Sequence, residues 1–131
     1  MFDLSEDEEQ KALDLNLKLV IVNASTVIKY ENQHFDKVRK GGITASNHTV
    51  TQPSSMLREG VKEISRFSKW LSSHADEALL VRRAEDIYKA KSEGKEGIIL
   101  GPQGADLIEN DLDLLRIFQL LGVTIIQLTY N

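Results

Sequence analysis

The segment Gly97–Asn131, GIILGPQGADLIENDLDLLRIFQLLGVTIIQLTYN, decides the fold. It contains an apolar run at Gly97–Leu100, an amphipathic stretch at Asp106–Leu121 and a second apolar run at Val123–Thr129. This order predicts a strand, a helix and a second strand. A strand that is apolar on both faces is typical of a parallel sheet covered by helices. The helix face expected to pack on that sheet consists of Leu112, Leu115, Phe118 and Leu121.

The rest of the chain continues the alternation of helices and strands. Two further strands are predicted at Leu17–Ala24 and Ile43–Val50, and Leu79–Val81 is a short apolar stretch. Helices are predicted from the capping box at Ser5 and Glu8 to about Asn16, around Tyr30, Phe35 and Val38 before Gly41, from Leu57 to Leu71, and at Ala84–Ser92. Short loops between such elements imply parallel βαβ units with right-handed crossovers. The sequence therefore predicts one α/β domain over residues 1–131.

Composition narrows the possible functions. The chain has 131 residues and a net charge of -4, with acidic and basic residues interspersed, which argues against a nucleic-acid or anionic-membrane surface. It has no cysteine, so disulfides, zinc–thiolate sites and thiol nucleophiles are excluded. The acidic N-terminus has no apolar core segment that could serve as a signal peptide or membrane span. We therefore expect a cytoplasmic protein.

The histidines give only weak signals for a site. His48 lies near the end of a predicted strand, where it could contact a ligand, although a surface or hydrogen-bonded structural role is the more common one for such a residue. His34 and His74 lie in polar, helix-like segments with no carboxylate at ligand spacing. The loop Gly101–Gly104 lacks the lysine of a phosphate-binding loop. No serine-hydrolase motif is present either.

The segment Ala84–Asn131 resembles the membrane (renal) dipeptidase family of metallopeptidases, most closely its bacterial branch. In that branch a helix beginning near AEDI leads to a strand GII, a loop with a GFQN-like motif, and a closing LGVRIIQLTYN. Here the corresponding loop is Gly101–Gly104 and the QLTYN ending is intact. The likeness is looser upstream, at Val20–Val22 and Gly41–Val50.

The resemblance implies a zinc-dependent dipeptidase built on a (β/α)8 barrel, in which two zinc ions at the C-terminal mouth of the strands activate a hydroxide. The family's first-strand motif DGHND aligns with Val22–Thr26, so Ala24 takes the position of a histidine ligand and Thr26 that of an aspartate ligand. Gln103 takes the position of the bridging glutamate. We therefore expect no catalytic or metal-ligating residue in this chain, and no zinc bound by the chain alone.

A minimal barrel of this type needs roughly 250 residues. The resemblance thus implies a truncated chain that supplies the first half of a barrel and is inactive alone. Its natural small-molecule partner would be dipeptide-like, and unpaired strand edges favour self-association or a complementing chain. The alternative function is a non-catalytic α/β module that binds a ligand or a protein. The candidate substrate-binding residues are His48, Gln103, Tyr130 and Asn131.

Overall fold

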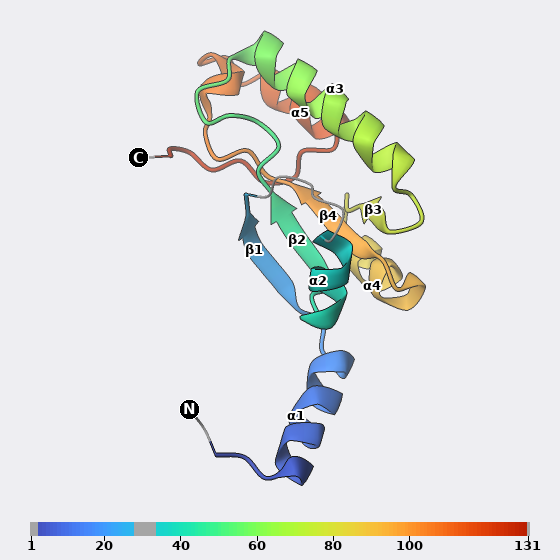
Figure 1. Cartoon of the computed structure of the whole chain (residues 1–131). Coiled ribbons are helices and arrows are strands. Elements are labelled where there is room, and N and C mark those ends of the chain that lie inside the picture. The colour runs from blue at the N-terminus through green and yellow to red at the C-terminus, as the bar shows by residue number, and fades with distance from the viewer. Residues whose placement is uncertain (1–2, 28–33, 131) are drawn as a thin grey trace.

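The computed structural model describes residues 3–27 and 34–130, and its centre is a four-stranded parallel sheet (Figure 1). The strands are β1 (Val22–Thr26), β2 (Ala45–His48), β3 (Ala78–Leu80) and β4 (Glu96–Leu100). Their order across the sheet is β1-β2-β4-β3, and each neighbouring pair is parallel. The α/β prediction is confirmed.

Helices connect and flank these strands. They are α1 (Glu6–Lys18), α2 (His34–Lys40), α3 (Leu57–Ser73), α4 (Ala84–Glu93) and α5 (Leu114–Leu120), with a short 3-10 helix, η1 (Asp106–Ile108). The capping box that starts α1 is present, since the Ser5 backbone N–H donates to the Glu8 carboxylate at 2.9 Å. The part of the predicted second helix that includes Tyr30 lies outside the described residues.

The strand order explains why helices cover both faces of the sheet. The chain passes from β2 to the outer strand β3 and then returns inward to β4, so a right-handed crossover places α4 on the opposite face from α2 and α3. Alternate residues of β4 point to opposite faces of the sheet. Ile98 and Leu100 join a cluster with Phe35, Phe67 and Phe118, whereas Ile99 packs with Ala45 and Val81.

Gly97 leaves room for the side chains packed on the face of the sheet that α4 covers. A Cβ atom at this position would lie 2.9 Å from Val81 Cγ2 and 3.0 Å from Ala45 Cβ, and both neighbours are buried. We expect Gly97→Ala to lower the free energy of unfolding by about 1–3 kcal/mol through overpacking, measured by urea denaturation. Gly41→Ala is the matched control, because a Cβ there meets nothing closer than 3.4 Å. Equal stability of the two variants would contradict this packing.

The predicted helix Asp106–Leu121 is wrong in its first half. The segment breaks after η1, where Glu109 and Asn110 have φ angles of 49° and 61°, and regular helix resumes only at Leu114. Asp111 contributes to the break, since its side chain accepts a hydrogen bond from the Asp113 backbone N–H at 3.0 Å. Of the predicted core face, Phe118 is fully buried while Leu112 is 72% exposed.

The predicted strand Val123–Thr129 is also wrong beyond its first residue. Val123 forms an isolated parallel bridge with Leu100, but no ladder follows. The edge of β4 is already occupied over three residues by β3, which pairs Ala78–Leu80 with Glu96–Ile98. Val123 pairs with Leu100, the last residue of β4, so the parallel segment that follows it runs beyond the end of that strand, and Leu128 is 86% exposed.

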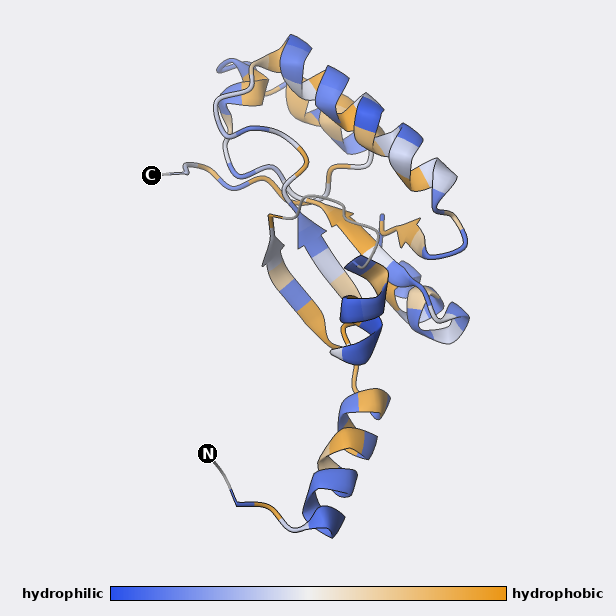
Figure 2. Ribbon diagram, viewed as in Figure 1, coloured by the Kyte–Doolittle hydropathy of each residue, from blue (hydrophilic) through white to orange (hydrophobic). Residues whose placement is uncertain are grey.

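α1 stands apart from the sheet (Figure 1), and it buries no residue. Figure 2 shows apolar residues on this helix. Its leucines Leu13 and Leu15 are exposed. Lys91 of α4 contacts the C-terminal end of α1, because its ammonium group donates to the carbonyls of Leu17 and Leu19 at 2.9 and 2.7 Å. Among the described residues, no helix is long and apolar enough to span a membrane.

Candidate functional site

The C-terminal ends of β1, β2 and β4 meet at one edge of the sheet, because neighbouring strands are parallel. The loop that follows β4 reaches across this edge, and Gln103 Nε2 donates to Ser25 Oγ at 3.1 Å. Asn47 Nδ2 donates to the Ala24 carbonyl at 3.0 Å. The structure therefore brings three of the sequence-predicted positions, Ala24, Thr26 and Gln103, to the same edge. This is the edge at which barrel enzymes place their sites.

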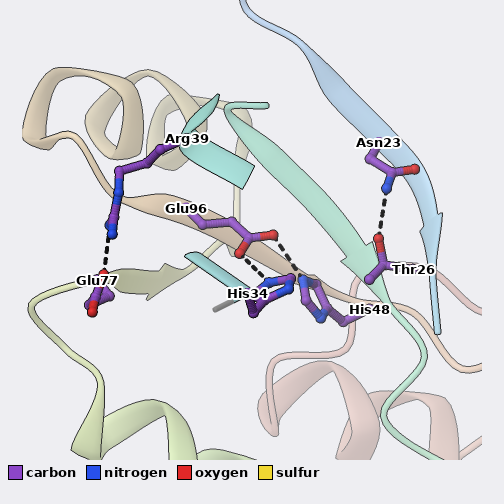
Figure 3. A network of polar contacts seen from close by, with 7 residues as sticks. All are labelled: Asn23, Thr26, His34, Arg39, His48, Glu77 and Glu96. Carbon is purple, nitrogen blue, oxygen red and sulfur yellow. Dashed lines mark hydrogen bonds and ion pairs between the residues drawn. The ribbon is translucent and has the colours of Figure 1, made fainter. Parts of the chain in front are cut away.

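The groups at this edge are uncharged. Ala24 has only a methyl group, and Thr26 is 4% exposed with its hydroxyl accepting a hydrogen bond from Asn23 Nδ2 at 2.8 Å (Figure 3). Gln103 offers an amide. Zinc sites use imidazole, thiolate or carboxylate ligands, and two adjacent dications need negative charge between them. These residues do not fit a binuclear zinc centre.

Asn47 is a polar residue of this edge that sequence reasoning did not select. Its Oδ1 is buried without a hydrogen-bond partner, and it lies against Gly101, where a Cβ atom would come within 1.8 Å of it. A glycine in this place therefore leaves room for the amide. The sequence shows the asparagine and the glycine, but only the pairing of β2 with β4 shows that they touch.

The segment before the C-terminus lies beside the loop that follows β4. The Gln127 backbone N–H donates to the Pro102 carbonyl at 3.0 Å, so the terminal segment runs beside the loop that carries Gln103. Tyr130 is 54% exposed, and Asn131 lies outside the described residues. Both remain predictions as substrate-binding residues.

His48, the last residue of β2, lies in a second polar cluster, on the other face of the sheet from Asn47. It is 1% exposed, and its Nε2 lies 3.1 Å from Glu96 Oε1. The other oxygen of Glu96 lies 2.7 Å from His34 Nε2, so one carboxylate stands between two imidazoles (Figure 3). The sequence favours a surface or hydrogen-bonded structural role for His48; the structure has the residue buried beside Glu96, and its role in substrate binding stays a prediction.

Glu96 is ionised in this cluster at neutral pH. Burial raises the pKa of the Glu96 carboxyl, but hydrogen bonds from His48 and Ser46 and the charges of the histidines outweigh it, so the pKa is lowered overall. Sequence reasoning missed His34 and Glu96 because they are 62 positions apart. One weak signal was available, a glutamate at the start of the apolar run EGIIL, which forms a strand whose five residues are all buried.

Known proteins are similar to this chain in sequence and structure. The family model for membrane dipeptidase, peptidase family M19, matches residues 7–131. A crystal structure of an amidohydrolase from Pseudomonas aeruginosa is 32% identical with a TM-score of 0.85, covering 91% of this chain and 36% of its own. No curated protein sequence matches significantly.

A second solved structure shows the same fold. The probable dipeptidase PvdM from Pseudomonas aeruginosa is 14% identical with a TM-score of 0.77, and the match covers 92% of this chain and 37% of that protein. The chain therefore spans little more than a third of the structures it resembles, and its parallel βαβ units correspond to part of a (β/α)8 barrel. With the family model matching almost from end to end, the chain belongs to the membrane dipeptidase family, peptidase family M19.

Proposed function

We propose that the chain provides the N-terminal part of a dipeptidase-like hydrolase that acts on short peptides, and that the 131 residues alone do not catalyse hydrolysis. The main support for the proposal is a pair of hydrogen bonds at the C-terminal edge of the sheet. Gln103, after β4, and Asn47, in β2, both donate to residues of β1. Family membership supports the class of reaction. A cytoplasmic location is part of the proposal, supported by a chain without cysteine.

The edge is suited to hold a peptide rather than to cleave it. The amide of Gln103 can donate and accept hydrogen bonds, and so it matches the N–H and C=O groups of a dipeptide. No residue at the positions of Ala24, Thr26 and Gln103 can act as a general base near neutral pH. The residues at these three positions therefore favour binding of a peptide over its hydrolysis.

Binding at this edge is testable by NMR. Addition of alanyl-alanine to the labelled chain is expected to shift the backbone amide signals of Gly101–Gly104, since this loop carries the Gln103 side chain proposed to contact the peptide. Gln103→Ala should remove the shifts, whereas Gln119→Ala, at an exposed position of α5, should retain them. Shifts that are unchanged in Gln103→Ala would show that the peptide does not bind at this loop.

We expect no hydrolysis of simple dipeptides by the isolated chain, even with added zinc, because the edge offers no charged ligand to hold two metal ions. The measurement is release of free amino acids, with a known zinc dipeptidase added to a parallel sample as the positive control. Turnover above the background of a mock purification would overturn the proposed inactivity.

A protein-binding role is the second candidate, and exposed apolar residues favour it. Around α5 and the terminal segment they are Leu112, Leu115, Ile117, Leu120, Ile125 and Leu128, each at least 39% exposed. Exposed apolar surface of this kind marks an interaction site or a liability to aggregate. In this alternative the occupant is a second copy of the chain or a complementing polypeptide.

Self-association is therefore expected for the isolated chain. Size-exclusion chromatography with light scattering should give a mass that rises with concentration, and Leu128→Asp should lower it because it places a charge on the most exposed of these leucines. Tyr88→Asp on α4, at a residue that is 65% exposed, is the control. A wild-type chain that stays monomeric at all concentrations would argue against this surface as an interface.

A further inference from the structure

The cluster of His34, His48 and Glu96 has the composition of a metal site. Each residue offers one ligand atom, and the three atoms lie within 4.8 Å of one another. Among residues 3–27 and 34–130 this is the group of His, Asp and Glu side chains that meets such a criterion. The three residues come from α2, β2 and β4, and Figure 3 shows both imidazoles facing the same carboxylate.

We propose that His34, His48 and Glu96 bind one divalent transition-metal ion of the zinc type. Zinc takes imidazole nitrogen and carboxylate oxygen at about 2.0–2.2 Å, so the ligands of one tetrahedral ion lie about 3.3 Å apart. The two N···O distances in the cluster are 2.7 and 3.1 Å. Small rotations of the side chains would lengthen these distances enough to admit an ion, and bonds to the ion would replace the two hydrogen bonds to Glu96.

The donor set selects among cations. Two imidazoles and one carboxylate suit zinc, cobalt or nickel, whereas magnesium and calcium prefer all-oxygen sites. Burial of the cluster also supports metal binding. The side chains of all three residues are at most 3% exposed. A buried ionised carboxylate is costly unless a positive charge accompanies it. A metal ion supplies that charge, and a proton on one imidazole is the competing source.

The surroundings resemble those of a structural site. Ser46 hydrogen-bonds to Glu96, which fixes the orientation of the carboxylate as outer partners do in metal sites. The rings of Phe35 and Phe67 lie 5.2 Å from His34 and 6.3 Å from His48, and they form apolar walls. A cavity of about 170 Å³ is lined in part by Phe35 and Glu96.

His48 ends β2 and pairs in register with Thr26, but two features distinguish the proposed metal site from the groups of the C-terminal edge. Glu96 is the first residue of β4, at the opposite end of that strand from the loop carrying Gln103. His48 also points to the other face of β2 from its neighbour Asn47, because side chains alternate along a strand. The ion would therefore tie α2 to β2 and β4 and stabilise the fold, without taking part in the chemistry proposed for the edge.

The test is a cobalt and zinc titration of the full chain after treatment with a chelator. We expect one equivalent of Co²⁺ to give the visible absorption of a tetrahedral site, and Zn²⁺ to displace it and raise the midpoint of thermal unfolding. Glu96→Gln and His48→Gln should lose the absorption. His74→Gln, a histidine outside the cluster, and Gln103→Ala should both keep it, which separates this site from the proposed peptide site.

X-ray absorption of the zinc-loaded wild-type chain provides a test that needs no variant to fold. The expected first shell contains two imidazole nitrogens and oxygen at about 2.0–2.2 Å. A shell with fewer than two imidazoles would overturn the proposal. Absence of stoichiometric binding, or binding that folded Glu96→Gln and His48→Gln retain, would overturn it as well and would assign the cluster to a proton-linked network.

Discussion

Glu96→Ala is expected to lower the free energy of unfolding by about 3–5 kcal/mol in metal-free buffer. The carboxylate is 1% exposed and is the shared partner of His34 and His48, so its loss leaves two buried imidazoles without that partner. Removing one member of a buried ion pair costs far more than the pair itself contributes, because the remaining polar groups stay desolvated. Urea denaturation followed by circular dichroism measures the change.

Glu77→Ala is the matched control for Glu96→Ala. Glu77 also forms an ion pair, with Arg39 at 2.6 Å, but the two side chains are 40% and 48% exposed. Exposed pairs of this kind contribute about 0–1 kcal/mol, because water screens them. If the two alanine variants lost similar amounts of stability, the buried network would not be a principal support of the fold.

Phe118→Ala is expected to cost a similar amount, about 3–5 kcal/mol. Phe118 is fully buried in the larger apolar cluster, and its ring lies 3.7 Å from the position that a Cβ on Gly60 would occupy. Truncation would leave a cavity between α5 and α3 that these helices cannot fill without moving. The change is measured by thermal and urea unfolding of the same sample.

Ile117→Ala provides the comparison for Phe118→Ala. It removes an apolar side chain from the same helix, but from a position that is 45% exposed. Substitutions at such positions usually change stability by less than about 0.5 kcal/mol. A large loss in Ile117→Ala together with a small loss in Phe118→Ala would mean that α5 packs by its other face.

Elements with strong local signals were predicted well. The apolar spacing from Leu57 to Leu71 became α3, and the run at Gly97–Leu100 became part of β4, because periodicity and burial agree there. The predicted first strand was placed too early, since β1 covers Val22–Thr26. A continuous apolar run gives no signal for where pairing begins, and the register with β2 decides that point.

The register of the last apolar segment was not visible in the sequence. Ala78–Leu80 pairs with Glu96–Ile98 of β4, whereas Val123 pairs with Leu100, where β4 ends. Hydrophobicity alone does not show where along its partner a segment pairs.

Part of the candidate site could be predicted from the sequence, and part could not. The resemblance placed Ala24, Thr26 and Gln103 near one another, and the hydrogen bond from Gln103 to Ser25 agrees with this arrangement. It did not indicate Asn47, whose role depends on the glycine that follows β4. Nor did it indicate the cluster around Glu96, which draws on three separate elements.

The sequence by itself determined the class of fold, the family and the loss of charge at the family's ligand positions, because each depends on residues that are near neighbours in the chain or match a motif in order. Only the tertiary structure decided that a buried glutamate stands between His34 and His48. Those contacts join residues 48 and 62 positions from Glu96. Sheet register and helix packing create such proximity, and no local pattern encodes it.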